Sequence, residues 1–266
     1  MKSLLATAIL LTTTTTFAHD TSFSSDSCDI ELNAGVRINK NYIEFTNNDK
    51  ALYKIINNET LIVNGEEVEL NDYQQSLVIE YSTSIREVIP EAKELALDAI
   101  EIAVEGVNLA FNELLGENND VGEDLTAHLY GIRDEVDQRF NSENEFYIDE
   151  NGDFADDFFS EELEQRIESA VEETIQNSLG SLLIAVGQEM LFAGGDMDAF
   201  EARMENFGEQ IERDIEHRAE KLEKRGEDLC HTVYKIDGIE TQLSQSIDAL
   251  SGFNVISADL DKRNKA

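Results

Sequence analysis

The sequence predicts an α+β fold that is mainly α, with a small N-terminal antiparallel β-sheet followed by long amphipathic helices. The first observation is that residues 29–70 contain short β-branched and aromatic runs separated by asparagines. The second is that the hydrophobic period changes from that of a strand to that of a helix after residue 70. The third is that a single proline occurs in 266 residues, so few positions can interrupt a helix.

Turn-forming residues separate the expected strands. The runs that favour extended structure are 35–38, 42–45, 52–56 and 61–63. Asparagine-rich turns lie between them. Asn64-Gly65 predicts a hairpin turn between residues 61–63 and 68–70, because both turn residues tolerate a positive φ.

The first expected helix begins at Asn71 or Asp72, either of which can cap it, and ends at Gly116. Its apolar positions recur at helical spacing along the whole stretch. Pro90 lies inside this pattern and predicts a kink or a split into two helices.

Further helices are expected in the second half of the chain. One covers residues 124–140 and is followed by a short strand at 146–148 and an acidic loop. Another begins at Ser160 and ends at the glycine pair 194–195. A capping box at 198–201 opens a long final helix. Its apolar seam consists of Phe200, Met204, Phe207, Ile211, Ile215, Leu222 and Leu229.

Residues 1–18 have the order of a secretory signal peptide, with basic Lys2, the apolar stretch 4–11 and the small residue Ala18. We expect cleavage before His19 and a periplasmic product. A retained membrane anchor is the alternative, but a span needs roughly 20 apolar residues, and threonines dilute this run.

The mature chain is expected to form one domain. Residues 19–70 make the small β-sheet region, residues 71–251 make the helical region packed with it, and residues 252–266 form a flexible tail. Neither a proline-rich or serine-rich linker nor an internal repeat separates these parts.

The two cysteines, Cys28 and Cys230, lie near opposite ends of the mature chain. An exported protein with an even cysteine count favours a disulfide, and two cysteines allow one pairing. The alternative is a pair of buried free thiols. Cys28 does not directly follow the cleavage site, so a lipid anchor is not expected.

The charge restricts the choice of partner. Lysine and arginine number 20 against 57 aspartates and glutamates, a formal net charge of −37. This balance excludes nucleic acid, whose binding depends on clustered basic residues. Anionic membrane surfaces should repel the chain as well. The most apolar later segment, 179–193, is shorter than a membrane span and contains Gln188 and Glu189, so a transmembrane protein is not expected.

Several motifs together resemble the YggN family of gammaproteobacterial envelope proteins. They are the N-terminal cysteine, the hairpin Val63-Asn64-Gly65 leading to Leu70 and Gln74, the alanine-rich helix that follows, and residues 226–230. The chain differs in being more acidic, with a longer insertion around 141–157. The family is of unknown function, so the resemblance implies export and a disulfide but no catalytic residues.

One acidic loop could hold a cation. Asp149, Asn151, Asp153 and Asp157 are closely spaced oxygen ligands of the kind that Ca²⁺ prefers. An EF-hand counted from Asp149 would need glycine and glutamate where Phe154 and Ser160 stand. A weak, open Ca²⁺ site is therefore the hypothesis, and a solvated turn is the alternative.

No catalytic constellation is apparent, and no cofactor apart from this Ca²⁺ is expected. Serine-hydrolase and zinc-protease motifs are absent, and acid/base carboxylate pairs cannot be distinguished among so many acidic residues. The leading hypothesis is a non-enzymatic periplasmic protein that binds an envelope component or an unfolded client through amphipathic helices. A Ca²⁺-responsive module at 149–157 is the alternative, and a hydrolase is a weaker one.

Overall fold

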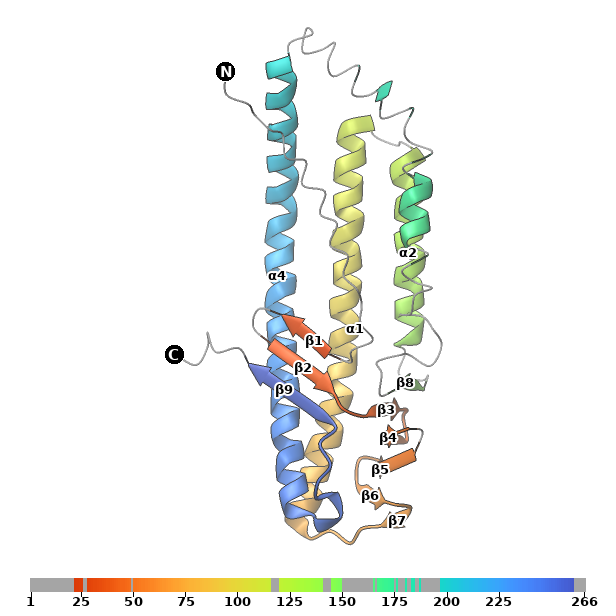
Figure 1. Ribbon diagram of the computed structural model, residues 1–266, viewed down its shortest axis with the longest axis vertical. Coiled ribbons are helices and arrows are strands. Elements are labelled where there is room, and N and C mark those ends of the chain that lie inside the picture. Colours follow the sequence, from red (N-terminus) through yellow and green to blue (C-terminus); the bar gives the residue numbers. More distant parts are fainter. Residues whose placement is uncertain are drawn as a thin grey trace.

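The computed structural model describes residues 22–25, 28–48, 50–115, 120–140, 145–149, 165, 167–174, 176, 180, 183–184, 187 and 197–260. Two long helices, α1 (Asp72–Leu115) and α4 (Met197–Ser246), run antiparallel along the molecule. Helix α2 (Asp120–Arg139) lies on the other side of α1, so that α1 contacts both α2 and α4 (Figure 1). Residues 167–174, within the expected third helix, are also helical.

The described strands form two antiparallel sheets near the lower end of the long helices (Figure 1). One sheet has six strands in the order β7-β6-β5-β4-β3-β8, and the other has three in the order β1-β2-β9. The six-stranded sheet contains β3 (Gly35–Ile38), β4 (Tyr42–Asn47), β5 (Lys50–Ile56), β6 (Thr60–Val63), β7 (Glu66–Glu67) and β8 (Phe146–Ile148). The three-stranded sheet contains β1 (Ser22–Ser25), β2 (Cys28–Leu32) and β9 (Ile256–Leu260), and a short 3₁₀ turn, η1 (Asp248–Leu250), follows α4.

The expectation of one small N-terminal sheet followed by helices is wrong. Two sheets form, and each recruits a strand from a distant part of the chain: β8 pairs with β3, and β9 pairs with β2. The flexible tail expected at 252–266 is wrong for Ile256–Leu260, because this segment is a strand with a continuous register to β2. Local sequence patterns indicate where a strand lies in the sequence but not which strand it pairs with. Strand pairing depends on tertiary packing.

The short-range predictions agree with the structure. Asn64 and Gly65 have φ values of 51° and 84° and join β6 to β7, which confirms the predicted turn. The second arm of the hairpin is Glu66–Glu67, however, and not residues 68–70 as expected. At the start of α1 the Gln74 N–H donates to Asn71 Oδ1, and the Asn71 N–H donates to Gln74 Oε1, each over 3.0 Å. This reciprocal capping box fixes the first turn of α1.

Helix α1 is not split at Pro90, since it continues without a break from Asp72 to Leu115. Pro90 is exposed, so its ring lies on the solvent side of α1 and does not disturb the core. Helix α2 begins at Asp120, four residues before the expected start at Asp124.

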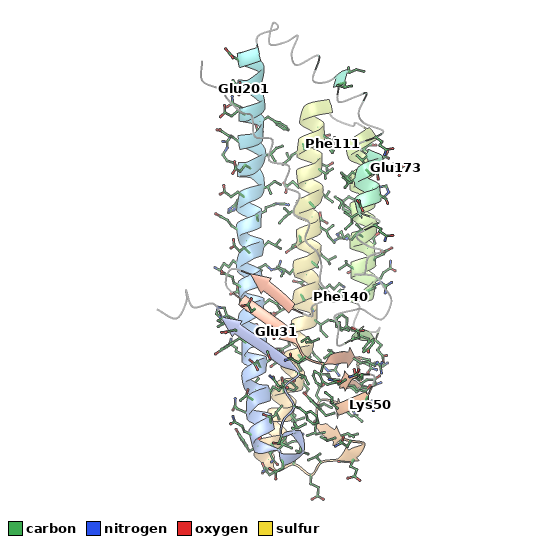
Figure 2. The ribbon with its side chains drawn as sticks, viewed as in Figure 1. Glu31, Lys50, Phe111, Phe140, Glu173 and Glu201 are labelled. Atoms are coloured by element: carbon green, nitrogen blue, oxygen red, sulfur yellow. A yellow bond between two sulfur atoms is a disulfide. The ribbon has the colours of Figure 1, made fainter. Side chains whose placement is uncertain are left out.

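The main core lies where the six-stranded sheet packs against the two long helices. Fully buried side chains come from the sheet, from the first turns of α1 and from the last turns of α4, and include Ile43, Phe45, Ile55, Leu61, Val78, Tyr81 and Leu243. At the edge of the sheet, Phe140 packs against Phe146 of β8 with ring centroids 5.2 Å apart (Figure 2). This contact ties the end of α2 to the last strand of the sheet.

The opposite half of α4 is packed much less tightly. Among the residues of 201–229 whose burial is described, none is buried. The predicted seam is only half-buried there, at Phe207, Ile211, Ile215, Leu222 and Leu229. We call the part of the molecule formed by the described residues among 92–115, 120–139, 165–187 and 197–229 the helical half. Its helices have a partly exposed apolar face, whereas the sheet-bearing half has a closed core.

A disulfide joins Cys28 of β2 to Cys230 of α4, as the sequence predicts, with Cα atoms 6.2 Å apart. Both cysteines are buried, so the alternative of two free thiols is wrong. The bond fixes the three-stranded sheet to α4 close to the point where the closed core begins. Among the described residues, no helix is long and apolar enough to cross a membrane.

Candidate functional site

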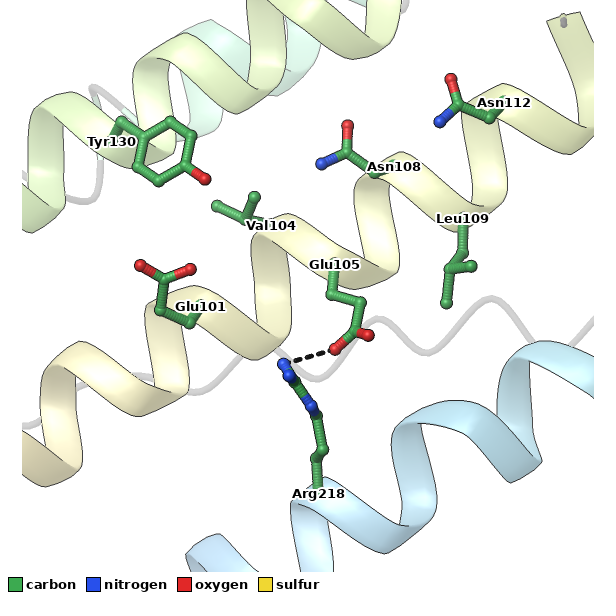
Figure 3. A pocket seen from close by; sticks show the side chains of 8 residues that line it. All are labelled: Glu101, Val104, Glu105, Asn108, Leu109, Asn112, Tyr130 and Arg218. Atoms are coloured by element: carbon green, nitrogen blue, oxygen red, sulfur yellow. Dashed lines mark ion pairs between the residues drawn. The ribbon is translucent and has the colours of Figure 1, made fainter. Parts of the chain in front are cut away.

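A cleft of about 440 Å³ opens over the middle of the helical half (Figure 3). Helix α1 forms its floor because α1 lies between α2 and α4 (Figure 1). The lining side chains are Glu101, Val104, Glu105, Asn108, Leu109 and Asn112 of α1, Tyr130 of α2 and Arg218 of α4.

Helical spacing explains why the floor is polar. Glu101, Glu105, Asn108 and Asn112 follow one another at intervals of four, three and four residues. Residues at these intervals share one face of a helix, so their carboxylates and amides line up along the cleft. Sequence reasoning missed this strip because it followed the apolar positions of the same helix. The available signal was the pair of asparagines inside an alanine-rich helix.

Both carboxylates of the floor are paired with arginines. Arg218 lies 2.5 Å from Glu105, an ion pair that joins α4 to α1 (Figure 3). Arg133 of α2 lies 2.8 Å from Glu101. These contacts draw all three helices together around the cleft, and both arginines and both glutamates remain partly exposed. Partly exposed pairs are weak, so an incoming charged group can compete for either partner.

The row of ion pairs continues along α4 toward the closed core. Arg225, seven residues after Arg218 and therefore on the same face, pairs with Glu94 at 3.3 Å and also with Asp98. On α1, Glu94, Asp98 and Glu105 follow the same face. In the helical half, ion pairs therefore act together with the half-buried apolar seam to hold α4 against α1.

The amides of Asn108 and Asn112 and the hydroxyl of Tyr130 complete the lining. The Thr126 hydroxyl donates to Asn108 Oδ1 over 3.2 Å, which orients that amide. The site thus offers hydrogen-bond donors and acceptors, charges of both signs, and the apolar side chains of Val104 and Leu109. Such a lining can hold polar and basic side chains of a bound polypeptide.

The family of proteins of unknown function named DUF2884 matches residues 28–256. The chain belongs to this family. The DUF2884 match begins at Cys28 and ends at the first residue of β9, so it includes both disulfide cysteines and the whole cleft. No curated protein and no solved structure matches the chain. Any function proposed for this DUF2884 protein therefore depends on the geometry of its own structure.

Most residues of the expected Ca²⁺ site lie outside the part of the chain that the structure describes. Asp149 directly follows β8, while Asn151, Asp153 and Asp157 lie outside the described residues. Within the described part of this DUF2884 chain, no group of three or more histidine, cysteine, aspartate or glutamate side chains could hold a metal. The Ca²⁺ site at 149–157 stays a prediction.

The sheet edge beside that loop is held by a polar cluster. The Tyr42 hydroxyl donates to Glu145 over 2.6 Å, and Arg37 lies 3.5 Å from the same carboxylate. The hydrogen bond from Tyr42 lowers the pKa of Glu145, and burial followed by this bond raises the pKa of Tyr42 to about 12. Glu145 therefore stays ionised and fastens the start of β8 to the sheet.

Proposed function

We propose that this DUF2884 protein is an exported, YggN-like periplasmic protein that is not an enzyme and binds a polypeptide, either an envelope partner or an unfolded client, through its helical half. The observation that carries the proposal is the half-buried apolar seam of α4 beside a polar cleft formed by three helices. The order of residues 1–18 and the Cys28–Cys230 bond support export.

Exposed apolar side chains gather in the helical half. Of the eight large hydrophobic side chains that are exposed in the described residues, five lie there: Tyr130, Ile167, Val171, Leu183 and Ile184. Several exposed large apolar side chains in one part of a protein favour an interaction surface there. Amphipathic segments bind such surfaces by placing apolar side chains on the seam and polar ones toward the rim.

Charge selects among polypeptides. With a formal net charge of −37, the chain repels acidic partners and attracts basic ones at low ionic strength. The favoured partner is therefore a basic amphipathic segment, and binding should weaken as salt is added.

The test compares matched surface variants of the disulfide-intact protein. Ile167→Ser with Val171→Ser alters residues 42% and 40% exposed in the helical half, and Ile79→Ser alters one 38% exposed beside the closed core. Suppression of aggregation of a basic unfolded client and binding of a hydrophobic dye are measured. We expect the double variant to weaken client binding roughly tenfold, because partial burial of two aliphatic side chains contributes about 1.5 kcal/mol.

The control Ile79→Ser should leave client binding unchanged. Absence of dye binding and of aggregation suppression in the wild type would reject the proposal. Equal effects of the double variant and the control would show that binding does not depend on the exposed apolar side chains Ile167 and Val171 of the helical half, and would reject their part in the proposed surface.

A further inference from the structure

On the α2 side of the cleft, an exposed aromatic ring lies beside two carboxylates. Tyr130 of α2 is 42% exposed, and its ring and the Glu101 carboxylate of α1 project into the cleft (Figure 3). Asp134 follows Tyr130 by four residues, so it lies on the same face of α2, and its side chain is 70% exposed. We call Glu101, Tyr130 and Asp134 the α2 subsite.

The two carboxylates of the α2 subsite share one cation. Arg133 Nε lies 2.8 Å from Glu101 Oε1, and Arg133 Nη1 lies 3.9 Å from Asp134 Oδ1. One positive charge therefore faces two negative charges, and the subsite has an excess of negative charge. Arg133 Nε is buried and makes no hydrogen bond within the described part of the chain. The pair with Glu101 is therefore held by charge without an aligned hydrogen bond, which makes it weaker than a bidentate pair.

A second cation can replace Arg133 at Glu101 at little cost. The Glu101 side chain is 40% exposed, so a group from solvent can reach it. Arg133 would keep Asp134 as its partner, and the exchange would leave no charge unpaired. Across the cleft, Glu105 pairs with Arg218, for which the described residues supply no second carboxylate. Exchange is therefore favoured at Glu101.

The Tyr130 ring favours one kind of cation. A guanidinium group is planar, so it can stack on an aromatic ring while its edge donates two hydrogen bonds to a carboxylate. An ammonium group has no such planar edge. A ring and a carboxylate that project into the same space therefore match an arginine side chain better than a lysine side chain.

We propose that the α2 subsite binds one arginine side chain of the polypeptide partner, with the guanidinium stacked on Tyr130 and donating to Glu101. This inference rests on the proposed function and adds the side chain that the cleft selects. The net charge of −37 attracts any basic segment from a distance. The subsite then fixes the position of one arginine, and specificity comes from this contact.

The experiment measures binding of two fluorescent amphipathic peptides to the full, disulfide-intact protein. The peptides have a single varied position at the centre, which is arginine in one and citrulline in the other, and they contain no other basic residue. Citrulline has nearly the shape of arginine but no charge. We expect the arginine peptide to bind roughly tenfold more tightly at low ionic strength, and added salt should reduce this preference.

Variants of the protein assign the preference to the subsite. Glu101→Gln and Tyr130→Leu should each reduce the preference for arginine over citrulline at least threefold and leave binding of the citrulline peptide unchanged. Glu223→Gln is the matched control, because it removes the same charge from an exposed position outside the cleft lining. This control should keep the full preference. If Glu101→Gln does not fold, Tyr130→Leu decides the assignment.

The outcomes separate this inference from the proposed function. If the protein suppresses aggregation of a basic client but binds both peptides equally or not at all, the subsite is wrong and the proposed function stands. An equal loss of preference in Glu223→Gln would also overturn the subsite, because the overall charge would then account for it. If the protein neither suppresses aggregation nor binds either peptide, the proposed function is wrong and the subsite is rejected with it.

Discussion

The Cys28–Cys230 bond closes almost the whole described chain into one loop, with the two cysteines 202 positions apart. Replacing both by alanine removes this constraint from the unfolded chain. In the chain-entropy description, a loop of this length restricts the unfolded state by about 5 kcal/mol at 25 °C. We expect Cys28→Ala with Cys230→Ala to lower the free energy of unfolding by about this amount.

Urea unfolding followed by circular dichroism measures the loss. The unfolding midpoint should fall, and the m-value should rise because the chain without a crosslink exposes more surface when unfolded. The reduced wild type is the control and should match the double variant, since both lack the same bond. A loss below about 2 kcal/mol would refute the loop-closure reasoning and show that the unfolded chain is already compact.

Four further predictions follow from individual contacts. Asn71→Ala removes one half of the capping box and should cost about 1 kcal/mol in chemical unfolding. Arg225→Ala breaks partly exposed ion pairs, so it should cost less than about 1 kcal/mol, and added salt should erase the difference from wild type. Burial raises the pKa of Glu240 on α4 from 4.5 to about 7, so its contribution to stability is fully present below pH 4.5 and is lost as the pH rises through 7. This loss is about 3 kcal/mol, and urea unfolding across this range should show it in the wild type but not in Glu240→Gln. Calorimetric titration with Ca²⁺ at moderate salt should give heat that Asp149→Asn with Asp153→Asn abolishes, and heat from screening alone would reject the site.

The parts of the fold that could be predicted from the sequence depend on neighbouring residues. The Asn64-Gly65 turn needs only two residues that accept a positive φ, and the start of α1 needs a capping side chain before an amphipathic run. The disulfide was predictable because two cysteines allow a single pairing. Strand β9 was not, since its sequence resembles a polar tail until β2 and Glu240 supply its hydrogen-bond partners.

The candidate site was hidden for a similar reason. Its floor is a polar strip on α1, but Tyr130 and Arg218 reach it only because α2 and α4 pack on either side. Sequence periodicity locates the apolar face of each helix and leaves the relative rotation of three helices undetermined. Asn108 and Asn112 stand out in the sequence as polar positions in an alanine-rich helix. The sequence does not indicate which side chains of the other helices face them.

The two halves of the molecule are stabilised by different forces, and this difference supports a binding role for one of them. Around the six-stranded sheet, fully buried side chains such as Phe45, Tyr81 and Leu243 exclude water, so opening that half exposes a large apolar surface. In the helical half, α4 is held by partly exposed ion pairs of Arg218 and Arg225 and by a half-buried seam, each of which contributes little. Local opening therefore costs less in the helical half, because less buried surface and weaker pairs are lost there. The polypeptide binding that we propose for the helical half would use this low cost of opening, while the disulfide and the closed core keep the remainder of the fold fixed.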